Sequence, residues 1–135
     1  MDEAEIRRRF YAARVARLAT AGTAGRPHIV PICFALAGDA IFFAVDHKPK
    51  RTTDLQRLRN ITQSPPVCVL VDHYEEDWTR VWWARADGRA RVLAAGSETD
   101  HAIDLLVARY EQYSAHRPEG PAVEIRVERF SGWSA

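Results

Sequence analysis

The chain has 135 residues, and its 19 Lys and Arg against 18 Asp and Glu give a formal net charge of +1. A chain of this length forms one domain, residues 1–135, without room for separate cofactor and substrate domains. The charge balance excludes a general attraction to nucleic acid, so local cations must hold any anionic ligand. Residues 1–6 lack the apolar core of a signal peptide, and no apolar run approaches membrane length. We therefore expect a soluble, cytoplasmic protein that binds neither nucleic acid nor membranes.

The apolar periodicity predicts a mainly β domain of the α+β type. Its expected elements are a helix over 2–13 and strands near 14–21, 28–37, 40–46, 66–73, 79–93 and 121–131. Turns at 22–26 and at Gly38 and Asp39 join the first three strands as an antiparallel meander. A short helix begins near Thr52, with Leu55, Leu58 and Ile61 along one side, and a longer helix begins with a capping box at 97–100. Because strands outnumber helices and form hairpins, we expect an antiparallel barrel with helices packed outside.

Two positions interrupt the predicted strands. Pro31 lies within 28–37, and proline cannot donate a hydrogen bond to a sheet, so this strand lies at an edge or contains a bulge. An exposed backbone edge at Pro31 is a place where a ligand can bind. Asp87 and Gly88 lie within 79–93, where a hairpin turn and a bend in a continuous strand are both compatible with the residues.

The strongest functional signal lies where the strand at 40–45 meets the next helix. Lys48, Lys50 and Arg51 precede Thr52, which we expect to cap that helix. Backbone N–H groups and the positive end of the helix dipole favour an anion at such a position, and three cations strengthen the preference. This pattern predicts a phosphate site; a solvated basic turn is the alternative.

The residues offer little catalytic machinery of their own. No serine lies in a nucleophile elbow, and Cys33 and Cys68 lie in apolar runs typical of buried free thiols. The five histidines are scattered without close ligand pairs, so we expect no metal site. A phosphate site without acid–base groups favours a phosphorylated redox cofactor that carries the chemistry itself.

The segments 25–34, 38–45, 50–55 and 65–72, in this order and spacing, resemble the pyridoxamine 5′-phosphate oxidase-like split β-barrel flavoproteins. They are similar, more narrowly, to the branch of this family that uses the deazaflavin coenzyme F420. The resemblance implies a homodimer of antiparallel split barrels of the FMN-binding type, each of about six strands. It also implies two cofactor sites at the subunit interface and a bend at Asp87 and Gly88 within one long strand.

The resemblance also implies roles for individual residues near the predicted phosphate site. It places Lys50, Arg51 and Thr52 on the cofactor phosphate, with Lys48 nearby. Val45 lies at the strand end below them. The resemblance thus assigns to this segment the same role that its charges and position favour.

A second set of residues is expected along the ring of the cofactor. Pro31 and Ile32 match the strand whose backbone lies beside the ring in the family; a bulge without a ligand is the alternative. Trp78 and Trp82, with Trp83, are candidates to flank the ring or a substrate. Aromatic residues of a small barrel also belong to the core or to a dimer interface.

The hypothesis is an oxidoreductase that transfers a hydride between coenzyme F420 and an unidentified small, planar, conjugated substrate. FMN is the alternative cofactor, since the same basic segment would hold its phosphate. A non-catalytic carrier of the cofactor or of a tetrapyrrole is the alternative function. Arg57, Arg59, Arg80 and Arg85 are available to contact the acidic tail of coenzyme F420.

Overall fold

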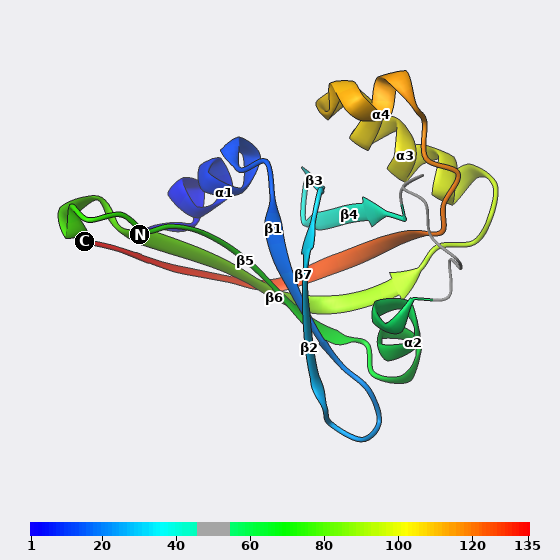
Figure 1. The fold of residues 1–135 in the computed structure, drawn as a ribbon, viewed down its shortest axis with the longest axis horizontal. Helices are drawn as coiled ribbons and strands as arrows, with labels where there is room; N and C mark the ends of the chain where they lie inside the picture. Colours follow the sequence, from blue (N-terminus) through cyan, green and yellow to red (C-terminus); the bar gives the residue numbers. More distant parts are fainter. Residues whose placement is uncertain (46–54) are drawn as a thin grey trace.

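The protein, described here from a computed structural model for residues 1–45 and 55–135, contains one antiparallel sheet that curls into a half-barrel (Figure 1). The described strands are β1 (Ala16–Ala21), β2 (Pro27–Ile32), β3 (Ala35–Ala37), β4 (Ala40–Ala44), β5 (Pro66–His73), β6 (Trp82–Val92) and β7 (Ala122–Ser134). Their order across the sheet is β2-β1-β5-β6-β7-β4-β3. This architecture confirms the expected split barrel of antiparallel strands.

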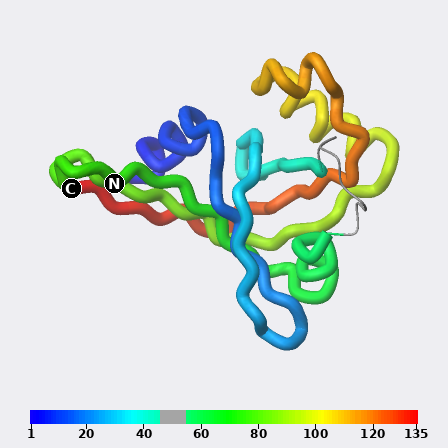
Figure 2. Tube along the Cα trace, viewed as in Figure 1, coloured from blue at the N-terminus to red at the C-terminus, as the bar shows by residue number. Residues whose placement is uncertain are grey.

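Helices pack against both faces of the sheet, and not only outside it as the sequence predicts. Ile6 and Leu58 share a core cluster with Phe43, whereas Ile103 shares one with Phe42 on the opposite face of the same strand. They are α1 (Glu3–Ala12), α2 (Gln56–Gln63), α3 (Ser97–Arg109) and the short α4 (Glu111–Ala115), with a 3₁₀ turn at Trp78–Arg80. Figure 2 shows α2 beside the β1–β2 hairpin, while α3 packs against β4 and α4 packs against α3. No described helix is long and apolar enough to cross a membrane.

The prediction of one strand over 28–37 is wrong. Residues 27–32 pair with β1 at one edge of the sheet, whereas residues 35–37 pair with β4 at the other. Phe34, between them, is fully buried and packs edge-to-face on Phe10, with ring centroids 6.0 Å apart. The backbone N–H of Phe34 donates to the Tyr110 hydroxyl at 3.0 Å instead of to a strand. The first strands therefore do not form a continuous meander, and this division raises the strand count to seven.

Gly88 lies at a bend within the continuous strand β6. Pairing of β6 with β7 shifts register between Asp87 and Gly88, while β6 remains paired with β5 across the bend. A Cβ atom at Gly88 would lie 2.3 Å from the carbonyl oxygen of Arg126, closer than atoms can approach. The bend that the family resemblance implied is confirmed, and the hairpin alternative is excluded.

The apolar core lies inside the curl of the sheet, and a second cluster lies between α3 and β4. Ile103 and Leu106 of α3 are buried in this second cluster, as their helical spacing predicts. The predicted capping box is wrong, because Ser97 is already helical and Gly96, with φ of 101°, is the N-cap. Thr99 instead donates its hydroxyl to the Ala94 carbonyl at 2.8 Å.

Candidate functional site

Strand β2 has a free edge, since only β1 pairs with it among the described strands. Of the two alternatives that Pro31 left open, an edge strand and a bulge, the structure shows the edge strand. Pro27, Ile29 and Pro31 share the outward face of the strand, and the Ile29 side chain is 65% exposed. Because successive side chains of a strand alternate, His28, Val30 and Ile32 face the other side. The β2 edge therefore presents an apolar surface of two prolines and an isoleucine.

Ile32 and Val45 lie in the main core, packed in one cluster with Leu58 and Ile61 of α2. Each of the two is 4% exposed. The backbone N–H of Val45 donates to the Pro121 carbonyl at 2.9 Å. Both of these predicted site residues therefore belong to the core, and neither side chain is presented at the surface.

The predicted phosphate-binding residues Lys48, Lys50, Arg51 and Thr52 lie outside the described residues. The described chain resumes just before the next helix. Helix α2 begins at Gln56, and its N-cap is Leu55, which has no side-chain capping hydrogen bond. The expected cap at Thr52 is therefore wrong for this helix, which begins farther along the chain.

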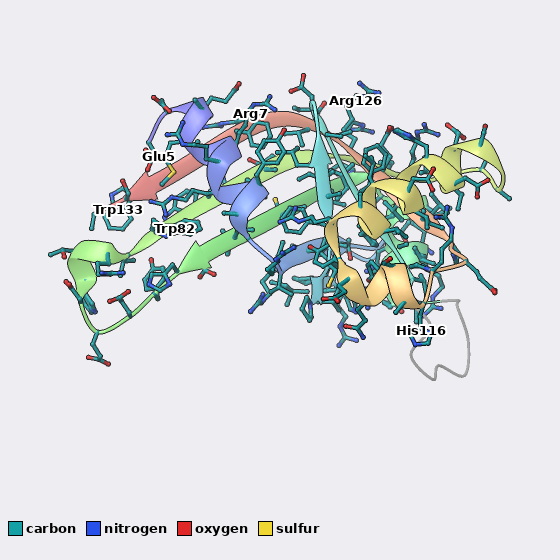
Figure 3. The ribbon with its side chains drawn as sticks, turned by 90° about the horizontal axis from the view of Figure 1, so that it is seen from above. Glu5, Arg7, Trp82, His116, Arg126 and Trp133 are labelled. Atoms are coloured by element: carbon teal, nitrogen blue, oxygen red, sulfur yellow. The ribbon has the colours of Figure 1, made fainter. Side chains whose placement is uncertain are left out.

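Trp78 and Trp82 lie far from Val45 within one chain. Ala44, next to Val45, pairs with Ala122 at one end of β7, and Trp82 pairs with Ser134 at the other end. These ends of a 13-residue strand lie about 40 Å apart along the strand. Figure 3 shows Trp82 below α1, at the opposite end of the molecule from His116.

The two tryptophans also differ in their surroundings. Trp78 is 79% exposed in its 3₁₀ turn, whereas the ring of Trp82 is half-buried beneath the guanidinium of Arg9, 4.5 Å from the ring centroid. Trp83 pairs across the sheet with Trp133, which is exposed. We call the end of the sheet where His73, Trp82 and Ser134 lie on paired strands β5, β6 and β7 the aromatic arm. This arm exposes aromatic surface.

A polar pocket that sequence reasoning missed lies between the β1–β2 turn and α2, and its volume is about 390 Å³. It is lined by Gly22, Thr23, Ala24, Arg26, Pro27, His28, Gln56, Asn60 and Gln63. Asn60 is a polar residue 2% exposed, and its side-chain amide donates to the Thr20 hydroxyl at 3.0 Å. One sequence signal could have revealed this pocket: Asn60 is a polar residue next to Ile61, on the apolar side of a short helix.

Burial and a neighbouring carboxylate disfavour ionisation of the Cys68 thiol. Burial raises its pKa, and so do its hydrogen bond to the Asp87 carboxylate, with Sγ and Oδ1 2.9 Å apart, and the charge of that carboxylate. Cys33 is also a free thiol. A raised pKa lowers the thiolate fraction and therefore the nucleophilicity of Cys68.

The described residues also contain no group of three or more His, Cys, Asp or Glu arranged to hold a metal ion.

Solved structures share this fold over nearly the whole chain. A conserved hypothetical protein from Mycobacterium tuberculosis has a TM-score of 0.79 and 20% identity, covering 99% of this chain and 85% of that one. A FAD-binding protein from Mesorhizobium loti has a TM-score of 0.71 and 22% identity, covering 98% and 94%. The haem storage protein of Vibrio cholerae has a TM-score of 0.74 and 16% identity, covering 98% and 93%. At these identities the likeness shows the fold.

The half-barrel with a free β2 edge defines a protein of the split-barrel class. The family model for pyridoxamine 5′-phosphate oxidase matches residues 2–134, so the chain belongs to that family. A search of curated proteins found no match.

Proposed function

We propose that this protein is an oxidoreductase that transfers a hydride between coenzyme F420 and a small conjugated molecule. The observation that carries the proposal is the free edge of β2, where Ile29 and Pro31 form an exposed apolar face. From Pro27 to Pro31 this edge is about 13 Å long, comparable to a three-ring heterocycle. Membership of a family named for an oxidase supports redox chemistry.

The backbone of the β2 edge suits the polar rim of such a ring. Along an antiparallel strand, the N–H and C=O groups of every second residue point toward the same neighbouring strand. Proline lacks an N–H, so Pro27 and Pro31 fit positions whose backbone groups point away from β1, and Ile29, midway between them, has the same orientation. The N–H of Ile29 and the carbonyl groups of all three residues therefore point toward the free edge. A ligand with both donors and acceptors would satisfy this edge, which in the described residues has no strand partner.

In this proposal Lys50, Arg51 and Thr52, with Lys48 nearby, bind the cofactor phosphate through charge-assisted hydrogen bonds. When bound, the cofactor supplies the hydride chemistry. The chain contributes position and exclusion of water, because its described residues place no nucleophile or paired acid and base at the β2 edge.

A homodimer completes the proposed site. Trp78 and Trp82 lie about 40 Å along the sheet from the Val45 end, too far to reach the same ligand within one chain. A two-fold dimer would bring the aromatic arm of one subunit to the cofactor of the other. The exposure of Trp78 and Trp133 supports an interface on this arm.

FMN is the second candidate cofactor, supported by the family match and by the FAD-binding protein that shares the fold. A non-catalytic carrier of a cofactor or tetrapyrrole is the second candidate function. The haem storage protein with the same fold favours it. The two functions differ in turnover and not in binding.

Titration of the purified chain with coenzyme F420 and with FMN, monitored by calorimetry, tests the choice of cofactor. We expect coenzyme F420 to bind more tightly, with an affinity that falls as salt screens its acidic tail. Tighter binding of FMN would reverse the choice. Incubation of reduced coenzyme F420 with a panel of conjugated acceptors tests catalysis, because hydride transfer to an acceptor restores the long-wavelength absorbance of the oxidised cofactor. Binding without turnover would identify a carrier.

A further inference from the structure

The pocket between the β1–β2 turn and α2, here called the hairpin pocket, has the charge of an anion site. Arg26 is exposed at its rim, and no Asp or Glu is among its lining residues. Figures 1 and 2 show the hairpin and α2 side by side. A cavity with a cation and several uncharged hydrogen-bonding groups favours a negatively charged ligand over a cation.

The wall of the hairpin pocket joins three polar side chains from β1, β2 and α2. Thr20 and His28 are direct cross-strand partners, so their side chains share one face of the sheet. Asn60 donates to the Thr20 hydroxyl at 3.0 Å and accepts from the Gln56 amide at 2.7 Å. Thr20 is 4% exposed, so this network is buried. Sequestering polar groups here costs stability unless each is paired.

One atom of this wall is unpaired. The Nδ1 atom of His28 is buried and has no hydrogen-bond partner among the described residues. An unsatisfied buried polar atom destabilises the folded state, and such atoms are uncommon in folded proteins unless they serve a function. Gln63 uses its side-chain oxygen to accept from the Thr23 N–H at 3.3 Å, which leaves its NH₂ group for another acceptor.

We propose that the hairpin pocket binds a compact oxyanion, a carboxylate or a phosphate. Its oxygens would accept hydrogen bonds from the imidazole of His28, from the NH₂ group of Gln63 and from Arg26. The Asn60 amide fixes the wall through Thr20 and Gln56. This site goes beyond the proposed hydride transfer and does not require the basic segment around Lys50.

The oxyanion has two sources, which the experiment separates. It is either an acidic group of the bound cofactor or part of a separate small molecule. If phosphate binds equally well to apoprotein and to cofactor-loaded protein, the pocket serves a separate ligand. If the cofactor displaces phosphate, the pocket holds an acidic group of the cofactor itself.

Imidazole NMR of the full chain, titrated with inorganic phosphate at constant ionic strength, tests the proposal. The His28 signals are assigned with His28→Gln. We expect the chemical shifts of the His28 signals to change with phosphate concentration until they saturate. This result requires no cofactor, so it is independent of the proposed oxidoreductase function. Absence of a saturable displacement would overturn the anion site.

Charge variants provide the matched comparison. Gln63→Glu preserves an acceptor for Thr23 but adds a negative charge to the pocket, so phosphate affinity should fall at least tenfold. Gln112→Glu adds the same charge to exposed α4, outside the pocket lining, and should leave affinity unchanged. Equal affinities of the two variants would contradict the proposal.

Phosphate binding at the predicted basic segment must be distinguished from binding in the pocket. In the double variant Lys50→Ala and Arg51→Ala, we expect the His28 signals to respond to phosphate as in the unmodified chain. Loss of the response in this variant would mean that the anion binds at the basic segment, and the hairpin pocket would be rejected.

Discussion

The hydroxyl of Tyr110 contacts both backbone polar groups of Phe34, accepting from its N–H at 3.0 Å and lying 2.9 Å from its carbonyl oxygen. The same hydroxyl lies 3.0 Å from the Arg14 carbonyl. Next to it, the Arg109 guanidinium stacks over the Phe34 ring, 4.7 Å from the centroid, and donates to the Tyr11 carbonyl at the end of α1 at 2.9 Å. These contacts from α3 and its C-cap hold the point where the chain passes from one edge of the sheet to the other.

Tyr110→Phe should therefore destabilise the fold. The variant leaves the Phe34 N–H without its partner, which costs about 1–3 kcal/mol of unfolding free energy. Urea denaturation measures the change. Tyr74→Phe removes the hydroxyl of an exposed tyrosine and is the matched control, with little expected effect. Equal stability of both variants would show that the Tyr110 hydroxyl does not hold the edge crossing.

Gly88→Ala should destabilise the protein by about 3 kcal/mol or more, because the new Cβ would overlap the backbone carbonyl of Arg126. The clash involves two hydrogen-bonded strands, and neither can move freely. Gly38→Ala is the comparison, since Gly38 has φ of 60° but open space around it, so its cost is conformational, about 1 kcal/mol. Thermal and urea unfolding should rank Gly88→Ala as the more harmful; the opposite order would contradict the packing explanation.

The double variant Lys50→Ala and Arg51→Ala should bind coenzyme F420 more weakly by several kcal/mol, since two charge-assisted hydrogen bonds to the phosphate are lost. Calorimetry gives the affinity and circular dichroism the fold. Arg8→Ala with Arg129→Ala removes two cations at exposed positions as a control. Unchanged affinity in a folded Lys50 and Arg51 variant would remove these residues from the site.

A mixed dimer tests whether two subunits share each cofactor site. Trp82→Leu alone and the Lys50 and Arg51 double variant alone should both bind weakly. After subunit exchange, each mixed dimer should recover one tight site, because the intact Trp82 of one subunit meets the intact basic segment of the other. No recovery after subunit exchange would place both groups in one chain.

Sedimentation at micromolar concentration provides the accompanying measurement. We expect a mass about twice the 15.3 kDa of one chain. An obligate interface of this kind buries more than about 2,000 Å² in total. A monomer that binds the cofactor with full affinity would contradict the shared site.

The raised pKa of Cys68 predicts slow alkylation near neutral pH. In a Cys33→Ser background, the rate of Cys68 alkylation by iodoacetamide should rise with pH. The rise should come at a higher pH than for an ordinary thiol, because the folded state favours the protonated form of Cys68. Asp87→Asn removes the carboxylate that raises the pKa through its hydrogen bond and charge, so the rise should move to lower pH. The pH at which the rate rises reports the ionisation of the thiol, whereas poor access of the reagent would lower the rate at every pH. If the rise came at the same pH in Asp87→Asn, the role of that carboxylate would be contradicted.

The sequence by itself determined the features that depend on neighbouring residues. Alternation in 121–131 and helical spacing at Ile103 and Leu106 define which faces are buried, because side-chain direction is set directly by backbone geometry. Pro31 restricted its strand to an edge or a bulge for an equally local reason, the missing N–H. The basic segment at 48–52 was evident in sequence, although it lies outside the described residues.

Tertiary structure decided the features that depend on distant residues. The division of 28–37 into β2 and β3 required Phe10 and Tyr110, and Tyr110 is 76 positions from Phe34 in the chain. The hairpin pocket required α2 to place Asn60 against Thr20, 40 positions away. The length of β7 separated Trp82 from Val45. Such contacts form only when the sheet curls, since no local rule specifies which distant side chain will satisfy a buried polar group.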